Sequence, residues 1–505
     1  MFDKVLVANR GEIALRVIRA CREMGVRTVA VYSEADAHAP HVREADEAIL
    51  IGPAPSRESY LKGDAIIAAA LRTGAQAIHP GYGFLSEREW FARAVRDAGL
   101  VFIGPPAEAI AAVGSKTAAR SLAISAGTPV VPGTTSALRD ADEAADVAAQ
   151  FGYPVLLKAA AGGGGKGMRI VHRREELADA LAAAKREAKS SFGDDAVYVE
   201  KYIVGPRHVE IQLLGDTHGT MLHLGERECS VQRRHQKMIE EAPSVAVTPE
   251  LRARMGAAAV AAARAAGYVN AGTCEFLLDA GGDFYFLEMN TRIQVEHPVT
   301  ELVTGVDLVQ WQLRIAAGEA LPFHQEDLDP SGWAMECRIT SEDPANNFLP
   351  STGRVQYLHV PSGPGIRWDG GIETGSEISL FYDPMLAKLI VWAPTRAAAI
   401  ARMHRALLEL TIEGVDTSRD FHLRVMEDAE FRSGDISIQW LERRLASLLS
   451  VQPPREAVLR AAIAAALLAE RERSGPQRAR RGAESSAVTS TTSPWLQAAR
   501  LDAIQ

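Results

Sequence analysis

The chain has 505 residues, enough for several domains, and its apolar fraction of 47% and charged fraction of 24% are typical of a globular protein. The net charge of −9 argues against a general nucleic-acid binder. The first residues carry charges and lack the apolar core of a secretion signal, and no apolar run approaches the length that spans a membrane. The cysteines, Cys21, Cys229, Cys274 and Cys337, are too widely spaced for a metal or redox motif. We therefore expect a cytoplasmic protein with reduced, buried thiols.

The start of the chain alternates strand and helix signals. Residues 4–8 form a short apolar run, residues 12–24 carry apolar side chains at helical spacing, and residues 27–32 form a second apolar run. Gly25 follows the helix where a glycine cap is common. This β-α-β order predicts a parallel, doubly wound sheet, and we place its boundary near residues 114–116.

Two segments of different character follow. Residues 130–200 are predicted to form a small α/β module, in which strands at 154–159 and 168–172 flank a glycine-rich loop. Residues 201–447 mix many short strands with helices, which favours an α+β domain.

The composition changes beyond residue 448. An alanine- and leucine-rich helix is predicted at 455–472, and residues 473–493 are rich in Arg, Ser and Thr, as flexible linkers are. We interpret the arginine cluster at 471–481 as a solvated linker; the alternative is a docking segment for an acidic partner.

The glycine-rich loop reads Gly-Gly-Gly-Gly-Lys-Gly at residues 162–167. Glycine has no Cβ, so the backbone N–H groups of this loop can approach phosphates closely. It is not a Walker A loop, because Met168 stands where the Lys-Ser or Lys-Thr pattern is required, and it runs into a strand rather than the helix of a Rossmann fingerprint. We predict a flap over nucleotide phosphates that is mobile without ATP, with Lys116, Lys158 and Lys166 as phosphate contacts. A flexible structural turn is the alternative.

A second polar segment runs Glu-Met-Asn-Thr-Arg-Ile-Gln-Val-Glu-His from Glu288 to His297, directly after an apolar-aromatic run. If the strand continues that far, Glu288 and Asn290 share one face, because side chains alternate along a strand. Glu275, at the edge of another apolar run, can supply a third oxygen. Carboxylates completed by waters and substrate phosphates are what Mg²⁺ prefers, so we predict a metal site; the alternative is a polar exit from a strand.

Five segments taken in order resemble the biotin carboxylase family of the ATP-grasp superfamily. They begin at Lys4, His79, Glu226, Glu288 and Tyr382 and read KVLVANRGEIA, HPGYGFLSE, ERECSVQRRHQK, EMNTRIQVEH and YDPMLAK. The resemblance covers residues 1–447. Arg88, where the family pattern has Asn, is expected to affect only local capping.

The resemblance implies a reaction in two halves. ATP and bicarbonate give carboxyphosphate and ADP, and N1′ of biotin, carried by another protein, attacks the CO₂ that carboxyphosphate releases. Glu275, Glu288 and Asn290 are expected to hold two Mg²⁺ or Mn²⁺ ions that bridge the ATP phosphates. The expected ATP contacts are Lys116, Lys158, Gly163, Gly164, Gly165, Lys166, Gly167, Glu200, Lys201, Ile203, His208, Gln232, His235, Glu275 and Glu288.

Bicarbonate is a small planar anion, which a guanidinium can hold with two hydrogen bonds. By resemblance, Arg292 is this clamp, Glu296 is the general base and Arg338 stabilises the biotin enolate. Lys237, Gln294 and Val295 complete the bicarbonate site, and Tyr82 lines its biotin end. His79 and His297 are interpreted as turn or supporting residues, Cys229 and Cys274 as packing residues, and Arg233 and Arg234 as partly a solvated charged face.

The implied fold is α/β and α+β. A Rossmann-like parallel-sheet domain (residues 1–113) precedes the ATP-grasp domain. The ATP-grasp domain itself (114–330) carries a mobile glycine-loop lid at about 130–200. A mixed C-terminal domain (331–447) and a helical, flexible extension (448–505) follow. The implied assembly is a homodimer acting with a biotin carboxyl carrier protein and a carboxyltransferase subunit, without nucleic acid or membrane.

The chain lacks the Met-Lys-Met sequence of a carrier domain and room for a transferase, so we expect a stand-alone subunit, whose extension is a candidate for contacting these partners. Acetyl-CoA carboxylase of fatty acid biosynthesis is the first expectation for the parent complex, and propionyl-, methylcrotonyl- and pyruvate-type carboxylases are alternatives. Another ATP-grasp ligase or a non-catalytic assembly subunit also stays open.

Overall fold

The computed structural model describes residues 1–134, 137–159, 168–450 and 455–474. The chain divides into two compact units, residues 1–449 and residues 450–505. The glycine loop at 162–167 and most of the predicted linker at 473–493 lie outside the described residues.

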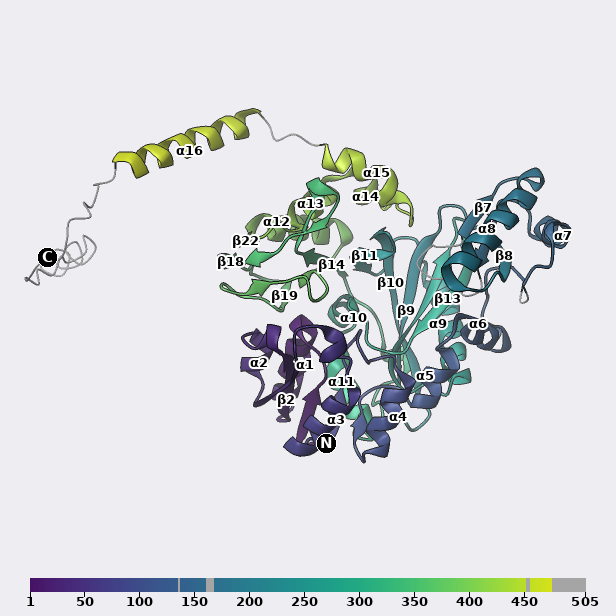
Figure 1. The fold of residues 1–505 in the computed structure, drawn as a ribbon, viewed down its shortest axis with the longest axis horizontal. Helices are drawn as coiled ribbons and strands as arrows, with labels where there is room; N and C mark the ends of the chain where they lie inside the picture. Colours follow the sequence, from purple (N-terminus) through teal and green to yellow (C-terminus); the bar gives the residue numbers. More distant parts are fainter. Residues whose placement is uncertain (135–136, 160–167, 451–454, 475–505) are drawn as a thin grey trace, which may run out of the picture. The chain divides into compact units, whose positions relative to one another are not determined.

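A five-stranded parallel sheet forms the N-terminal part (Figure 1). Its strands run in the order β3-β2-β1-β4-β5 and comprise β1 (Lys4–Val7), β2 (Arg27–Ser33), β3 (Glu47–Gly52), β4 (Ala77–His79) and β5 (Val101–Phe102). The helices are α1 (Gly11–Glu23), α2 (Pro40–Glu44), α3 (Gly63–Thr73), α4 (Glu89–Asp97) and α5 (Ala107–Val113). All of β1 is buried, as a central parallel strand requires, and Gly25 has the positive φ of 72° predicted for the residue after α1.

A small three-stranded module follows, which is named the lid module after its predicted role. It begins after α6 (Lys116–Ser125), and its antiparallel strands run in the order β7-β6-β8. Its elements are α7 (Ala141–Phe151), β6 (Val155–Ala159), β7 (Met168–Val171), α8 (Leu177–Phe192) and β8 (Val197–Lys201). Both predicted strands beside the glycine loop are present, and they pair with each other, so the loop connects two antiparallel neighbours.

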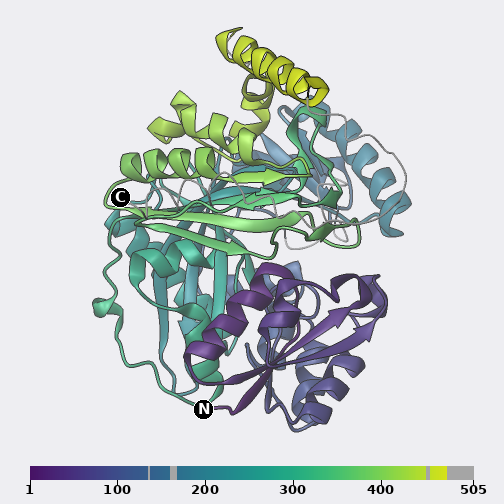
Figure 2. The same ribbon diagram turned by 90° about the vertical axis from the view of Figure 1, so that its left-hand side faces the viewer.

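Residues 207–393 contribute the strands of one long eight-stranded antiparallel sheet (Figure 2). The order is β13-β12-β9-β10-β11-β14-β21-β19, with β9 (Arg207–Gly215), β10 (Met221–Arg233), β11 (Gln236–Ala242), β12 (Asn270–Leu278), β13 (Phe284–Asn290), β14 (Trp333–Thr340), β19 (Ile366–Gly370) and β21 (Met385–Ala393). In the views of Figures 1 and 2, the N-terminal sheet lies below the β14 and β19 end of this long sheet, and α1 contacts β19.

Helices and short strand pairs complete the unit. They are α9 (Pro249–Ala265), α10 (His297–Thr304), α11 (Leu308–Ala316), α12 (Arg396–Glu409), α13 (Arg419–Glu427), α14 (Ala429–Ser433), α15 (Trp440–Leu449), β15 (Glu342–Asp343) with β16 (Leu349–Pro350), β17 (Gly353–Arg354) with β20 (Glu377–Ile378), and β18 (Tyr357–His359) with β22 (Thr411–Glu413). On β14, Met335, Cys337 and Ile339 pack in the same apolar core as helix α12, so Glu336 and Arg338 face the opposite side.

The second unit contains α16 (Arg455–Ser474), where a helix was predicted. Among the described residues, no helix has the length and apolar character needed to cross a membrane. The predicted α/β and α+β fold class is confirmed.

Candidate active site

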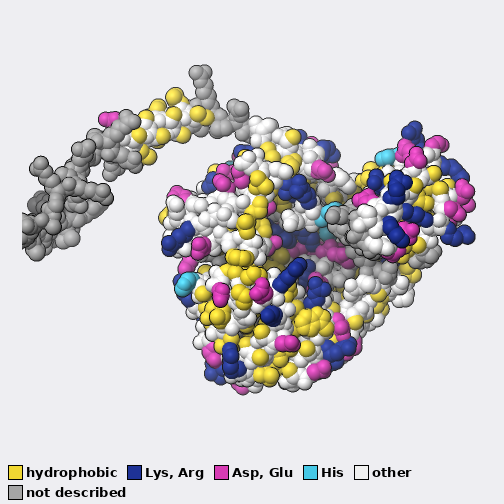
Figure 3. All heavy atoms as spheres, viewed as in Figure 1, with side chains coloured by type: hydrophobic (Ala, Val, Ile, Leu, Met, Phe, Trp, Pro, Cys, Tyr) yellow, Lys and Arg dark blue, Asp and Glu magenta, His cyan; other side chains and the backbone are white. Residues whose placement is uncertain are grey.

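A cavity of about 800 Å³ lies between the lid module and the long sheet. Its lining includes residues of β6 and β8 from the lid, of β10 to β13 from the sheet, and of the segments before β21 and α15. Figure 3 shows this face of the molecule hollowed, with acidic side chains inside the hollow.

Lys237, on β11, is at the centre of an acidic cluster. Its Nζ lies 2.5 Å from Glu210 Oε2, 3.0 Å from Glu275 Oε1 and 2.6 Å from Glu296 Oε1. Beneath it, Arg227 is fully buried and its Nε donates to Glu210 Oε1 at 2.5 Å. The cluster is therefore held together by one fully buried cation, Arg227, and one largely buried cation, Lys237.

These contacts decide the ionisation of the cluster. Burial lowers the pKa of Lys237, but Glu210 and Glu296 outweigh it and hold that pKa well above its usual range. Burial raises the pKa of Glu296, but Lys237, Arg338 and Arg227 outweigh it and hold the pKa well below its usual range. Glu296 is thus an anion that is 0% exposed, able to accept a proton once a substrate competes for these cations.

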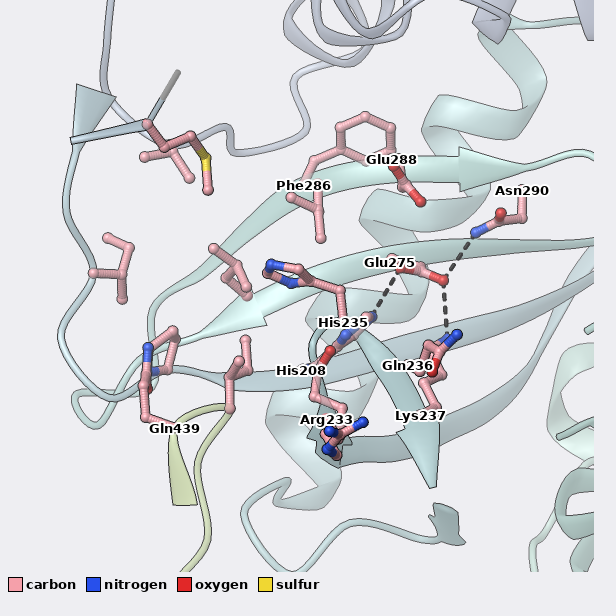
Figure 4. Close-up of a pocket in the computed structure, with 18 of the residues that line it drawn as sticks. His208, Arg233, His235, Gln236, Lys237, Glu275, Phe286, Glu288, Asn290 and Gln439 are labelled. Atoms are coloured by element: carbon pink, nitrogen blue, oxygen red, sulfur yellow. Dashed lines mark hydrogen bonds and ion pairs between the residues drawn. The ribbon is translucent and has the colours of Figure 1, made fainter. Parts of the chain in front are cut away.

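The predicted metal ligands come from paired strands. Glu275 on β12 and Glu288 on β13 are register partners, and Asn290 follows two residues later on the same strand. Figure 4 shows Glu275 between His208, Lys237 and Asn290. Glu275 Oε2 lies 2.8 Å from His208 Nε2, and its Oε1 accepts from Asn290 Nδ2 at 2.9 Å.

This donor set fits a hard divalent cation. Burial raises the pKa of Glu275, but Lys237 and His208 outweigh it and the pKa is lowered, so its oxygens stay anionic. Two carboxylates and an amide oxygen on adjacent strands provide the oxygen ligands that Mg²⁺ takes when phosphates complete its coordination.

Arg292 is oriented by its neighbours. Its Nε donates to Glu87 Oε2 at 3.1 Å, its Nη1 to Gln294 Oε1 at 2.8 Å and its Nη2 to Asn290 Oδ1 at 3.2 Å. Gln294 also donates to Glu275 Oε1 at 3.1 Å. The guanidinium predicted to clamp bicarbonate therefore lies next to the predicted metal ligands, at the edge of the same cavity.

Arg338 approaches Glu296 from β14. Its Nη2 lies 3.0 Å from Glu296 Oε2 and 2.6 Å from Glu240 Oε1. The carbonyl of Val295 accepts from Lys388 Nζ at 2.9 Å. Tyr82 does not line this cavity; its hydroxyl donates to Glu12, and the ring packs with the core between α1 and α11.

At the lid end of the cavity, Lys158 on β6 pairs with Glu200 on β8. The side chain of Lys201 donates to the carbonyl of Gly152 at 2.8 Å, and Ile203 lines the cavity. Gln232, His235 and Arg233 line the opposite wall.

The structure describes only some of the predicted phosphate contacts. Gly163, Gly164, Gly165, Lys166 and Gly167 lie outside the described residues, and Lys116 begins α6 without a described side chain.

The turn between β10 and β11 has an unusual backbone conformation. Arg233 pairs with Gln236, so the turn has two residues, and these are Arg234 (φ 50°) and His235 (φ 66°). Both are left-handed, a conformation that two-residue turns usually give to Asn or Gly. The turn directs His235 toward the cavity.

The predicted supporting residues are buried or hydrogen-bonded around the site. His79 is buried between Gln312 and the N–H of Gly81, and His297 is buried with Nδ1 against the carbonyl of Gln294. All four cysteines are free and buried, as predicted. Arg88 precedes α4 without a side-chain cap, and Arg233 packs on the Phe348 ring and donates to Asn347 rather than standing free in solvent.

The sequence analysis predicted no role for Glu210, Arg227, Glu240 or Gln439. Glu210, Arg227 and Glu240 belong to the ionic cluster, and Gln439 lines the cavity with an Oε1 atom that is buried and has no hydrogen-bond partner among the described residues. Glu210 and Arg227 sit on long polar-apolar strands where only the alternation of charged residues hints at a buried polar face. Gln439 follows a loop far from every motif, and no local signal marks it.

Three domain families match the chain in order. Residues 1–110 match "Biotin carboxylase, N-terminal domain", residues 115–324 match "Carbamoyl-phosphate synthase L chain, ATP binding domain", and residues 336–443 match "Biotin carboxylase C-terminal domain".

Similar proteins point to the same family as the domain matches. Biotin carboxylase 1 of Bacillus subtilis is 51% identical over 443 residues, covering 88% of this chain and 98% of the relative. The mitochondrial methylcrotonoyl-CoA carboxylase subunit alpha of Dictyostelium discoideum is 52% identical over 452 residues, covering 89% of this chain but 65% of the relative's length. A solved structure of the biotin carboxylase domain dimer of Hydrogenobacter thermophilus 2-oxoglutarate carboxylase, with MgADP, ADP and bicarbonate, aligns with a TM-score of 0.82 at 49% identity, over 90% of this chain and all of that domain. The chain belongs to the biotin carboxylase family, ATP-dependent ligases of the ATP-grasp superfamily.

Proposed function

We propose that the chain carboxylates N1′ of biotin with ATP and bicarbonate, through carboxyphosphate. The observation that carries the proposal is the contact of the buried Glu296 with both Lys237 and Arg338, which line one cavity. Arg292, Glu275 and Asn290 line the same cavity. The Hydrogenobacter domain, solved with ADP and bicarbonate, supports it.

ATP takes the part of the cavity between the lid and the sheet. Lys158, the glycine loop and Lys116 are proposed phosphate contacts, with Lys201, Ile203 and Gln439 near the base and ribose. Glu275, Glu288 and Asn290 are proposed to hold Mg²⁺ or Mn²⁺, which would neutralise charge on the phosphates during transfer. Glu275 is kept ionised for this purpose by Lys237 and His208.

Bicarbonate is proposed to lie against Arg292, whose guanidinium is fixed in place by Glu87 and Gln294. Glu296 takes the proton from the bicarbonate hydroxyl, and the carbonate oxygen attacks the γ-phosphorus while ADP leaves. Lys237 stabilises the negative charge on the bound anion.

Carboxyphosphate then releases CO₂ and phosphate. The phosphate takes the N1′ proton of biotin, and N1′ attacks the CO₂ carbon. Arg338, whose charge is assured by Glu240 and Glu296, stabilises the enolate oxygen that forms on the ureido ring. Glu296 then releases the proton that it took from bicarbonate to solvent, which restores the base for the next turnover.

The domain division that we propose is residues 1–113, 114–330 with a lid at about 130–200, 331–447 and 448–505; the three matched ranges support its first three parts. We further propose a homodimer, a cytoplasmic location, and action on a separate biotin carrier protein with a carboxyltransferase subunit. The dimer of the Hydrogenobacter domain supports the first of these.

The acceptor of the parent complex is proposed to be acetyl-CoA, in fatty acid biosynthesis. The relatives of this chain include a methylcrotonoyl-CoA carboxylase and a 2-oxoglutarate carboxylase. The acceptor must therefore be assayed with the transferase present.

The test is ADP release by the purified chain with Mg²⁺, with and without bicarbonate and free biotin. ADP release that requires bicarbonate and rises with biotin supports the proposal. Release that is indifferent to biotin but rises with an amine or another acid would assign the chain to a different ATP-grasp reaction.

A further inference from the structure

Two buried carboxyl groups near Arg338 take part in no step of the proposed reaction. Glu240 on β11 and Glu336 on β14 are direct register partners in the antiparallel sheet, and both are 0% exposed. Neither oxygen of Glu336 has a hydrogen-bond partner among the described residues, and Glu240 Oε2 has none either. Like charges directly opposite each other on a sheet repel, so this pair cannot carry two negative charges and retains a proton.

Arg338 connects the pair to the base. Its Nε lies 2.7 Å and its Nη2 2.6 Å from Glu240 Oε1, and the same Nη2 lies 3.0 Å from Glu296 Oε2. Glu240 and Glu296 therefore share one guanidinium. The charge on Glu240 decides how strongly Arg338 stabilises the anion of Glu296.

We propose that Glu240 is a positioning residue that sets the base strength of Glu296 through Arg338, while Glu336 holds the proton of the carboxyl pair. An ionised Glu240 draws Arg338 toward itself and repels the charge on Glu296, which makes Glu296 the stronger base. A neutral Glu240 leaves Arg338 to Glu296, which makes Glu296 the weaker base. The inference rests on the proposed role of Glu296 in biotin carboxylation.

The surroundings of the pair support this division of roles. The charged and titratable groups that face it are Arg338, Lys388, Lys237, Glu296, Tyr82 and Cys229. Burial raises the pKa of Glu240 to about 7, with Arg338 lowering it and Glu296 raising it. Burial raises the pKa of Glu336 well above its usual range, and Lys388 only partly offsets this. Glu240 is thus the member that titrates near neutral pH.

The test is the pH profile of kcat for biotin-stimulated, bicarbonate-dependent ADP release, in the wild type, Glu240→Gln and Glu240→Asp. We expect the wild-type rate to rise as Glu240 ionises near pH 7. Glu240→Gln should match the wild type at low pH and fall below it as pH rises, by up to about tenfold for each unit that the pKa of Glu296 loses. Glu240→Asp keeps a titrating carboxyl and should keep the rise.

Two further variants sharpen the result. Glu336→Gln mimics a neutral Glu336 and should keep the wild-type midpoint; a midpoint displaced to lower pH would show that Glu336 is charged and overturn its role. Glu241→Gln is the matched control, because Glu241 is a buried carboxylate on the same strand that pairs with Arg396 at 2.7 Å, away from the site. It should keep the shape of the wild-type profile.

A Glu240→Gln rate that is lower by the same factor at every pH, or equal to the wild-type rate at every pH, would overturn the inference alone. A wild-type chain without biotin-stimulated ADP release would instead overturn the proposed function, and this inference with it.

Discussion

Replacing Lys237 by methionine removes the cation that three buried carboxylates share. Its Nζ contacts Glu210 at 2.5 Å, Glu296 at 2.6 Å and Glu275 at 3.0 Å, and the lysine side chain is only 12% exposed. Methionine has a similar length and no charge, so the packing is largely kept while the ionic contacts are lost.

The cost follows from the partners that remain. Removing one partner of a buried ion pair costs about 3–5 kcal/mol, because a buried charge is left uncompensated. Arg227 still pairs with Glu210, and Arg338 still pairs with Glu296, so the three losses should not add. We expect Lys237→Met to lower the free energy of unfolding at neutral pH by roughly 3–5 kcal/mol.

The loss should depend on pH with a definite sign. Lys237 is the main attractive contributor to the lowered pKa values of Glu275 and Glu296, and a lowered carboxyl pKa contributes stability above the unfolded value of 4.5 that is lost as pH falls through the folded value. The gap between the two proteins should therefore be full at neutral pH and narrow as pH falls below 4.5.

Urea unfolding followed by tryptophan fluorescence measures this gap. Lys185→Met is the control, because within the described part of the chain Lys185 Nζ donates only to the carbonyls of Leu138 and Arg139, and its loss should cost about 1 kcal/mol. A Lys237→Met chain as stable as the control at every pH would refute the electrostatic account of the cluster.

Three other variants test separate parts of the account. Glu296→Gln should lower kcat by at least about 100-fold while calorimetric ATP affinity stays close to wild type, and retained turnover would remove Glu296 as the base. Gln439→Ala should raise the KM for ATP about five- to tenfold with little change in kcat, because one hydrogen bond to the nucleotide is lost, and an unchanged KM would place Gln439 outside the nucleotide site. Because the pKa of Glu240 is raised from 4.5 to about 7, the stability it contributes below 4.5 is lost as pH rises through 7. Urea unfolding should therefore find that Glu240→Gln gains roughly 3 kcal/mol on the wild type over that pH window, and a constant difference would contradict the raised pKa.

The first strand and helix, and the shared face of two predicted metal ligands, could be predicted from the local sequence pattern. Residues 4–8 form an apolar run and residues 12–24 carry apolar side chains at helical spacing, and the structure places β1 and α1 there. The two-residue spacing of Glu288 and Asn290 predicted a shared face, and β13 extends to Asn290, so they do share it.

The ionic cluster was not accessible in the same way. Glu240, Glu336 and Arg338 meet because β11 and β14 pair in one register, although Glu240 and Arg338 are 98 positions apart in the chain. Register between distant strands depends on the packing of the whole sheet, which no local window contains. Gln439 reaches the cavity for the same reason, through the packing of α15 and its preceding loop on the sheet.

Transfer of carbon from labelled bicarbonate to biotin tests the central claim most directly. The purified chain is incubated with labelled bicarbonate, ATP, Mg²⁺ and free biotin, and the acid-labile label on biotin is counted against the ADP formed. The account predicts ATP-dependent labelling of biotin that disappears in Glu296→Gln. ADP formation without any label on biotin, in a folded chain that binds ATP, would contradict it.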